Sequence, residues 1–287
     1  MSASDTPVPG SGSRAGRDLP AAIAVGCLLA GTIFATLFTV RLIWVGVICA
    51  AVAVGTYELA CALVRGGWHT PRVPTALVAG ALPLVAYLAG PDGLVTSTAV
   101  GVVLLAGWLL VDSRQEPGSP ALLSDLAALG FTLLYVGFLA GFAALLSQPS
   151  DGPRRVVTFI ATCAGADIGG YAAGVLSGGR HKLAPTISPG KSWEGAAGAA
   201  VTCMVAGGMF FAFLLHRPVL LGVVFGLAVT ASATLGDLGE SMIKRDLDIK
   251  DMGNLLPGHG GVMDRLDSLL LTAPVAWVLI TSWAPLS

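Results

Sequence analysis

The chain has 287 residues, of which 54% are hydrophobic and 11% are charged, and its formal net charge is −1. This composition excludes a soluble globular protein, because apolar runs of about 20 residues recur and each is long enough to cross about 30 Å of hydrocarbon as a helix. A β-barrel is excluded because the runs are continuous rather than alternating. The net charge alone indicates nothing about partners. We expect no nucleic-acid partner. We therefore predict an all-α polytopic membrane protein embedded in the lipid bilayer.

The first 18 residues are rich in Ser, Gly, Pro and Asp, and we expect a disordered tail there. Nine apolar spans follow, each expected to be a transmembrane helix. They cover residues 20–40, 42–64, 73–89, 94–111, 121–147, 155–176, 196–215, 219–240 and 264–284. The chain divides into N-terminal transmembrane helices over 19–150 and a C-terminal transmembrane region over 151–287, which holds the polar segments of interest.

Lys and Arg are distributed unevenly between the two sides of the predicted membrane. With the N-terminal tail numbered as segment zero, the even segments carry 12 of the 16 Lys and Arg residues and the odd segments carry 4. Positive charge accumulates on the cytoplasmic side. We therefore expect an integral protein of the plasma or inner membrane. Its N-terminus and its loops at 177–195 and 241–263 would face the cytoplasm, and its C-terminus would lie outside.

Two carboxylates lie inside predicted spans, Glu58 in the second and Asp167 in the sixth. Placing an acid inside a membrane span costs free energy, so each such acid is a candidate functional residue. Glu58 is interpreted as a buried, hydrogen-bonded acid near the cytoplasmic end of its helix. The alternative is a cation transporter that uses Glu58 and Asp167 as ligands. This alternative is disfavoured because most charges lie in long loops rather than at the middle of the bilayer.

The loop after the sixth span reads GGRHKLAPTISPGKSWEG and has the properties of an anion site. Arg180, Lys182 and Lys191 bring positive charge to it. Ser192 can cap a helix that opens at Trp193, and the N-terminus of that helix would face a phosphate. An ordinary positive cytoplasmic loop would explain the charges but not the spacing of Pro, Ser and Glu.

The densest polar stretch covers 241–267 and reads SMIKRDLDIKDMGNLLPGHGGVMDRLD. Its Pro-Gly-His-Gly-Gly segment predicts a turn without regular helix. Just before and inside this stretch, Asp237, Ser241 and Lys244 are spaced i, i+4 and i+7, which places them on one helix face.

Asp264 and Asp267 share a face at the start of the ninth span. If the eighth and ninth spans are antiparallel neighbours, Asp237 and Asp264 meet near the cytoplasmic surface. Two adjacent carboxylates need a cation between them, or one must stay protonated. Their hard oxygen ligands suit Mg²⁺. The alternative is that these helix-end acids pair only with Lys244 and Arg265.

Residues 241–267 resemble the signature of the phosphatidate cytidylyltransferases, also called CDP-diacylglycerol synthases. The matching positions are Ser241, Lys244, Arg245, Lys250, Asp251, Gly253, Pro257, His259, Gly260, Gly261, Asp264, Arg265 and Asp267. The loop at 177–195 resembles a second, weaker motif of the same family. Its matching positions are Lys182, Leu183, Pro185, Ile187, Ser188, Pro189, Lys191, Glu194 and Gly195. Ser192 stands where Thr is usual, and Arg180-His181 stands where Gly-Lys is common.

The resemblance implies a nucleotidyltransferase that converts CTP and phosphatidate into CDP-diacylglycerol and pyrophosphate, with a homodimer suggested. It implies catalytic roles for Asp237, Lys244, Arg245, Lys250, Asp251, Asp264, Arg265 and Asp267. It implies substrate-binding roles for Asp167, Lys182, Ser188, Lys191, Ser192, Glu194, Ser241, His259, Gly260 and Gly261. Asp237 and Asp264 would hold Mg²⁺ in a site for two cations, the second of unknown identity.

This reaction agrees with the residue types present. A phosphomonoester has its second pKa near ~6 and is already a nucleophile at neutral pH, so no Ser/His/Asp or Cys/His constellation is needed. The reaction does need cations, because two polyanions must approach each other. The runner-up is a CTP-using lipid kinase of the dolichol kinase type. A CDP-alcohol phosphotransferase is disfavoured because its Asp-Gly-x-x-Ala-Arg motif is absent.

Overall fold

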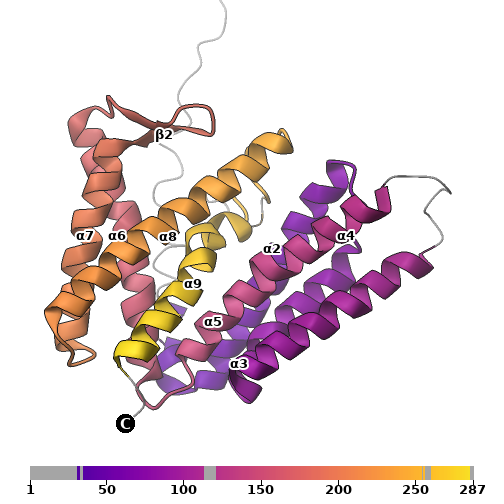
Figure 1. The fold of residues 1–287 in the computed structure, drawn as a ribbon, viewed down its shortest axis with the longest axis horizontal. Coiled ribbons are helices and arrows are strands. Elements are labelled where there is room, and N and C mark those ends of the chain that lie inside the picture. The colour runs from indigo at the N-terminus through magenta and orange to yellow at the C-terminus, as the bar shows by residue number, and fades with distance from the viewer. Residues whose placement is uncertain (1–30, 33–34, 113–120, 254, 256–259, 285–287) are drawn as a thin grey trace, which may run out of the picture.

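The computed structural model describes residues 31–32, 35–112, 121–253, 255 and 260–284 (Figure 1). Its helices and strands in chain order are α2 (Arg41–Arg65), α3 (Arg72–Val111), α4 (Ala121–Thr132), the π-helix η2 (Leu133–Phe138), α5 (Leu139–Leu146), α6 (Gly152–Ser177), β1 (Lys182–Ala184), β2 (Ser188–Ser192), α7 (Trp193–Phe213), α8 (Val219–Asp246) and α9 (Met263–Trp283). The predicted tail over 1–18 lies outside the described residues.

In the described part of the chain, seven helices are long and apolar enough to cross a membrane. One of them is the continuous run Leu122–Leu146, made of α4, η2 and α5. The prediction of an integral membrane protein built from helices is therefore confirmed. The count of nine stays a prediction, since α3 spans two predicted segments and most of 20–40 lies outside the described residues.

Helix α3 covers both the third and the fourth predicted span, and it is interrupted at Gly90. Gly90 has φ 71° and ψ −165°, a conformation that an L side chain would disfavour, and Pro91 follows it. A Cβ atom added to Gly101 would lie 2.7 Å from Cγ1 of Val78. These two positions would be about 35 Å apart in a straight helix. The two arms of α3 therefore fold back against each other.

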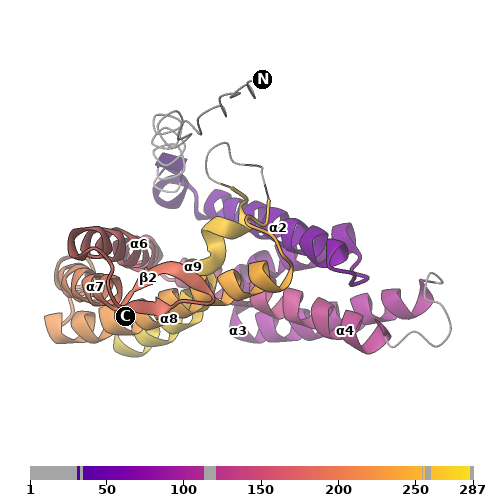
Figure 2. The same cartoon turned by 90° about the horizontal axis from the view of Figure 1, so that it is seen from above.

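The helices form two groups with α9 between them, as the two perpendicular views show (Figures 1 and 2). Helices α6, α7 and α8 pack together on one side, and α2, α3, α4 and α5 pack on the other. Helix α9 contacts α8 and α6 in the first group and α5 and α2 in the second. The polar segments of the C-terminal half are thereby held against the N-terminal helices.

A short β-hairpin corrects the purely helical expectation. Strands β1 and β2 pair antiparallel, with Lys182 opposite Ser192 and Ala184 opposite Ser188. The hairpin stands at the ends of α6 and α7 (Figure 1). It is outside the apolar spans, so its backbone groups can also be satisfied by water. Its function in the fold is to present Lys182 and Lys191 over the ends of three helices.

Candidate active site

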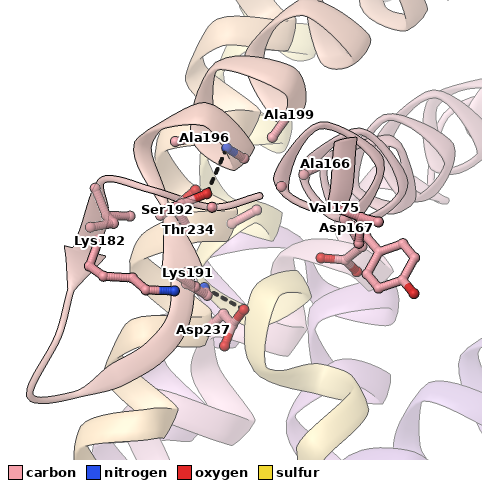
Figure 3. A pocket seen from close by; sticks show the side chains of 18 of the residues that line it. Ala166, Asp167, Val175, Lys182, Lys191, Ser192, Ala196, Ala199, Thr234 and Asp237 are labelled. Carbon is pink, nitrogen blue, oxygen red and sulfur yellow. Dashed lines mark hydrogen bonds and ion pairs between the residues drawn. The ribbon is translucent and has the colours of Figure 1, made fainter. Parts of the chain in front are cut away.

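A cavity of about 520 Å³ lies beneath the β-hairpin, between α6, α7 and α8 (Figure 3). Its volume is in the range of small-molecule sites. The lining residues that carry polar side chains are Asp167, Tyr171, Lys182, Lys191, Ser192, Thr234 and Asp237. Five of these seven were predicted as site residues from the sequence, so the structure brings the weaker motif and the end of the eighth span together.

Small residues create the space for this cavity. Gly170 and Gly174 of α6 face Gly195 of α7, and all three line the cavity. At the end of α6, Gly178 adopts the left-handed conformation with φ 73°. Glycine accepts this conformation at no steric cost, and it ends the helix. The chain can then turn into the hairpin that covers the cavity.

Ser192 is the N-cap of α7, as predicted. Its Oγ accepts a hydrogen bond from the backbone N–H of Gly195 at 3.1 Å, and its φ and ψ are extended. Ser192 is buried and, with Gly195, lines the cavity. The N-terminus of α7 therefore lies at the cavity, and the positive end of its dipole favours an anion there.

The cavity contains an ion pair between Lys191 of β2 and Asp237 of α8. Figure 3 shows this pair between Lys182 and Asp167, with all four residues lining the cavity. Asp167 is attracted by Lys191 and Arg265 and repelled by Asp237. The cavity thus holds two acids and two lysines, and Lys191 can exchange its carboxylate partner for a phosphate.

Helices α8 and α9 are antiparallel neighbours, but their register separates Asp237 from Asp264. Oγ of Ser232 donates to Oγ1 of Thr272 at 3.1 Å. A Cβ atom added to Gly236 would overlap the carbonyl oxygen of Asp267. This register places Asp237 level with Asp267, about one helical turn from Asp264.

Asp264 belongs instead to a second cluster, which we call the Lys244 network. Nζ of Lys244 lies 2.7 Å from Oε2 of Glu240 and 2.5 Å from Oδ1 of Asp264. Asp264 also accepts backbone N–H groups from Gly261 at 2.6 Å and from Met252 at 3.2 Å. The side chain of Asp264 is 6% exposed and that of Glu240 is 2% exposed. The network is therefore closed and fastens the described residues between α8 and α9 (247–253, 255 and 260–262), which we call the α8–α9 loop.

Three further predicted residues lie on or beside the hairpin. Nε of Arg245, in the last turn of α8, donates to the carbonyl oxygen of Ile187 at 3.2 Å. Glu194 pairs with Nδ1 of His181 at 2.7 Å across the hairpin base. Ser188 begins β2. These contacts fasten the hairpin to α7 and α8, so the two polar loops predicted to share a side do lie together.

The remaining predicted residues that the structure describes lie on α8, on α9 or between these helices. Gly260 has φ 77°, and a Cβ atom there would lie 2.8 Å from Oδ2 of Asp264 and 3.6 Å from Oδ1 of Asp251. Lys250 and Asp251 are exposed beyond α8, and Arg265 is exposed in the first turn of α9. Ser241 is on α8 and Asp267 is on α9. His259 lies outside the described residues.

For two acids of this region, the sequence did not predict the partner that the structure shows. Glu240 was not assigned a role, although its i, i+4 spacing from Lys244 is a signal for an ion pair. Glu58 was recognised as buried, but its partner could not be predicted. Its Oε2 accepts the backbone N–H of Met263, which is 205 positions away in the chain. No local pattern encodes a contact of that separation.

The acids of the site fit a magnesium ion unequally. Among the described residues, no group of three or more His, Cys, Asp or Glu side chains is placed to hold a metal ion. Asp237 lines the cavity, and its side chain is 33% exposed. Its carboxylate oxygens have the hard chemistry that Mg²⁺ prefers. Asp264 has the same chemistry, but it would have to exchange Lys244 for the ion.

The fold and the cavity define a polytopic membrane protein with a cavity lined by charged side chains at one end of its helices. A family model described as the cytidylyltransferase family matches residues 20–283. A phosphatidate cytidylyltransferase of Mycobacterium leprae is 41% identical over 282 residues, covering 93% of this chain and 89% of that protein. One from Mycobacterium bovis is 39% identical over 277 residues, covering 94% of this chain and 90% of that protein.

A phosphatidate cytidylyltransferase of Brucella suis is 42% identical over 148 residues, covering 51% of this chain and 54% of that protein. The chain therefore belongs to the cytidylyltransferase family. The resemblance stated from the two motifs is confirmed, and so is the prediction of an enzyme of this class. The match also extends over the N-terminal helices, where the sequence motifs gave no information.

Proposed function

We propose that this chain transfers the cytidylyl group of CTP to phosphatidate and releases CDP-diacylglycerol and pyrophosphate. The observation that carries the proposal is the cavity, in which Lys182, Lys191 and the N-terminus of α7 converge. Its wall on α6 includes Tyr171 and Val175, which are exposed on the apolar surface of that helix. A polar site with an apolar border suits one water-soluble and one lipid substrate. The relatives named phosphatidate cytidylyltransferases add to this support.

In the proposed reaction, an oxygen of the phosphatidate phosphate attacks the α-phosphorus of CTP. The bond from that phosphorus to the oxygen bridging to the β-phosphate breaks, and its electron pair leaves with pyrophosphate. No side chain has to remove a proton, because a phosphomonoester is largely ionised near neutral pH. The chain's contribution is to orient two polyanions and to neutralise their charge.

The residues of the cavity divide this work. Lys191 would leave Asp237 for a phosphate oxygen, and Lys182 would approach from β1. The positive end of the α7 dipole would attract a second phosphate, with Ser192 holding the first turn of that helix in place. Two phosphorylated substrates can thus be bound at once without burying an unpaired charge.

Magnesium is part of the proposal. Asp237 and Asp264 would hold it, with Lys244 withdrawn from Asp264, and a second cation of unknown identity would share the site. When bound, a divalent cation polarises phosphoryl oxygens and stabilises the charge that develops on the leaving group. The cavity position of Asp237 supports this assignment more directly than the closed position of Asp264 does.

The proposed site faces the cytoplasm, where CTP is available. Support comes from the 12 to 4 distribution of Lys and Arg, and from the contact between Arg245 and the hairpin, which keeps both basic loops at one end of the helices. Topology reporters fused after Ser177 and after Ser287 should give opposite signals. The same signal from both fusions would contradict the proposed orientation. A homodimer, tested by the mass of the purified protein, is also part of the proposal.

The activity itself is tested by adding CTP and phosphatidate to the purified protein and measuring pyrophosphate. We expect release only when both substrates and Mg²⁺ are present. Release without phosphatidate would indicate hydrolysis of CTP, and consumption of CTP without pyrophosphate would contradict the proposal.

A further inference from the structure

The most unusual contact in the molecule joins the N-terminal helices to the start of α9. Glu58 is on α2, is 8% exposed and accepts the backbone N–H of Met263 through Oε2 at 2.9 Å. The backbone N–H of Val262 is a second hydrogen-bond partner of this carboxylate. Val262 is the N-cap residue of α9, and its side chain makes no capping hydrogen bond. Glu58 therefore caps α9 from another helix, where the helix dipole favours its negative charge.

The α8–α9 loop is shaped around this carboxylate. A Cβ atom added to Gly253 would overlap Oε1 of Glu58, and one added to Gly261 would overlap Oε2. Both glycines therefore leave the space that the carboxylate fills. Burying a carboxylate without such N–H partners would cost free energy. Burying these N–H groups without an acceptor would also cost free energy. The fit is specific to an acid at position 58.

Asp264 binds the same loop. The N–H of Gly261 donates to Oδ2 of Asp264, and the N–H of Met252 donates to Oδ1. Gly261 thus donates to Asp264 and also lies against Glu58. Asp264 in turn holds Lys244. The position of Glu58 is therefore transmitted through Gly261 to Asp264 and Lys244.

We propose that Glu58 is a positioning residue for cytidylyl transfer, which fixes the α8–α9 loop and the start of α9 so that Asp264 and Lys244 keep their places. This inference rests on the proposed function. Glu58 is not among the residues that line the cavity, so we assign it no contact with substrate. The transporter hypothesis would give the same acid a bound cation instead. The observed partners of Glu58 are N–H donors, which favours the positioning role.

The test replaces Glu58 and follows both turnover and loop order. In Glu58→Ala we expect kcat to fall about 10- to 100-fold, which is the usual loss when a residue that orients a metal-binding side chain is removed. KM for CTP should change less, because the cavity lysines are untouched. Without substrate, amide hydrogen exchange at Gly261 and Met263 should be faster. Glu58→Gln keeps one acceptor oxygen and should lie between the wild type and the Ala variant.

Asp125 provides a matched control. It is 1% exposed and accepts a backbone N–H, that of His69, through Oδ1 at 2.8 Å. Asp125→Ala therefore loses the same kind of buried contact, away from the α8–α9 loop. We expect it to leave exchange at Gly261 and Met263 unchanged and to keep most of kcat. Equal losses of kcat in the two Ala variants, with no change in loop exchange, would overturn the positioning role.

A double mutant sharpens the test. Gly253→Ala should lower kcat in the wild-type background, because its methyl group overlaps Glu58, and should add little in the Glu58→Ala background. Additive effects of the two substitutions on kcat would overturn the proposed fit. A Glu58→Ala variant with the same kcat and loop exchange as the wild type would overturn it as well. If the wild-type protein transfers no cytidylyl group, the proposed function fails, whereas the exchange data still decide whether Glu58 holds the loop.

Discussion

The site contains two lysine–carboxylate pairs that use the same chemistry in opposite ways. Lys191 and Asp237 meet in an open cavity, with side chains 23% and 33% exposed. Lys244 and Asp264 meet in a closed network, with Asp264 only 6% exposed and bound by backbone N–H groups. An exposed pair costs little to separate, whereas removing one partner of a buried pair leaves an uncompensated charge. We infer that the first pair separates when substrate binds. The second pair maintains the framework and would separate only where a cation replaces Lys244 at Asp264.

Most of the stronger sequence motif lies in the closed network and the loop around it, and the cavity is lined mainly by the weaker motif and α6. Among the described residues, those of the denser signature therefore lie beside the cavity and not in its lining. Backbone N–H groups and glycines at special conformations constrain the loop, and such constraints make a recognisable pattern. A cavity formed between helices requires only small residues and a few charges.

The largest expected effects come from the two acids. Asp237→Asn and Asp264→Asn should each remove nearly all activity, because losing a metal ligand costs several kcal/mol of transition-state stabilisation. Only Asp264→Asn should also loosen the loop, since Asp264 accepts N–H groups from Met252 and Gly261. Turnover at saturating Mg²⁺ and amide exchange at Met252 and Gly261 measure the two effects. Near-normal turnover in either variant would remove that acid from the proposed metal site.

A smaller loss is expected in the cavity from Lys191→Gln. Removing one positive donor from a phosphate site should lower kcat/KM about 10²- to 10³-fold. Amide exchange in the α8–α9 loop should stay unchanged, because the ion pair of Lys191 is with Asp237 in the cavity. Arg72→Gln is the control, since Arg72 is exposed at the start of α3. Loop exchange that increases in Lys191→Gln would show that the two pairs are not independent.

The smallest effect is expected at the cap of α7. Ser192→Ala removes the bond to the N–H of Gly195 and should destabilise the protein by about 1 kcal/mol. Ser192→Thr keeps the hydroxyl and should restore both the thermal midpoint in detergent and the activity. A Thr variant as impaired as the Ala variant would show that Ser192 matters for its size rather than for its cap.

The sequence predicted the features that depend on local chemistry. Apolar runs predicted the spans, and the hydroxyl before Trp193 predicted the cap of α7. The β-hairpin was not predicted, because its strands contain Pro189 and Gly190 and show no alternation of polar and apolar residues. The π-helix η2 lies inside a uniform apolar run and left no signal either.

The parts that escaped prediction depend on register and on distant partners. Spacing placed Asp237 and Asp264 at the correct ends of their helices, but only packing shows that Asp237 is level with Asp267. Glu58 could be recognised as an expensive buried acid, but its partner Met263 lies in another helix. The cytoplasmic orientation and the metal stay predictions.

The central claim is that the lipid phosphate attacks the α-phosphorus of CTP. It is tested most directly with CTP labelled separately at the α- and the γ-phosphorus, given to the purified protein with phosphatidate in mixed micelles. The account predicts that the α label enters the lipid fraction and that the γ label is released in pyrophosphate. A γ label recovered in lipid would mean transfer of a terminal phosphate, as in a lipid kinase, and would contradict the account.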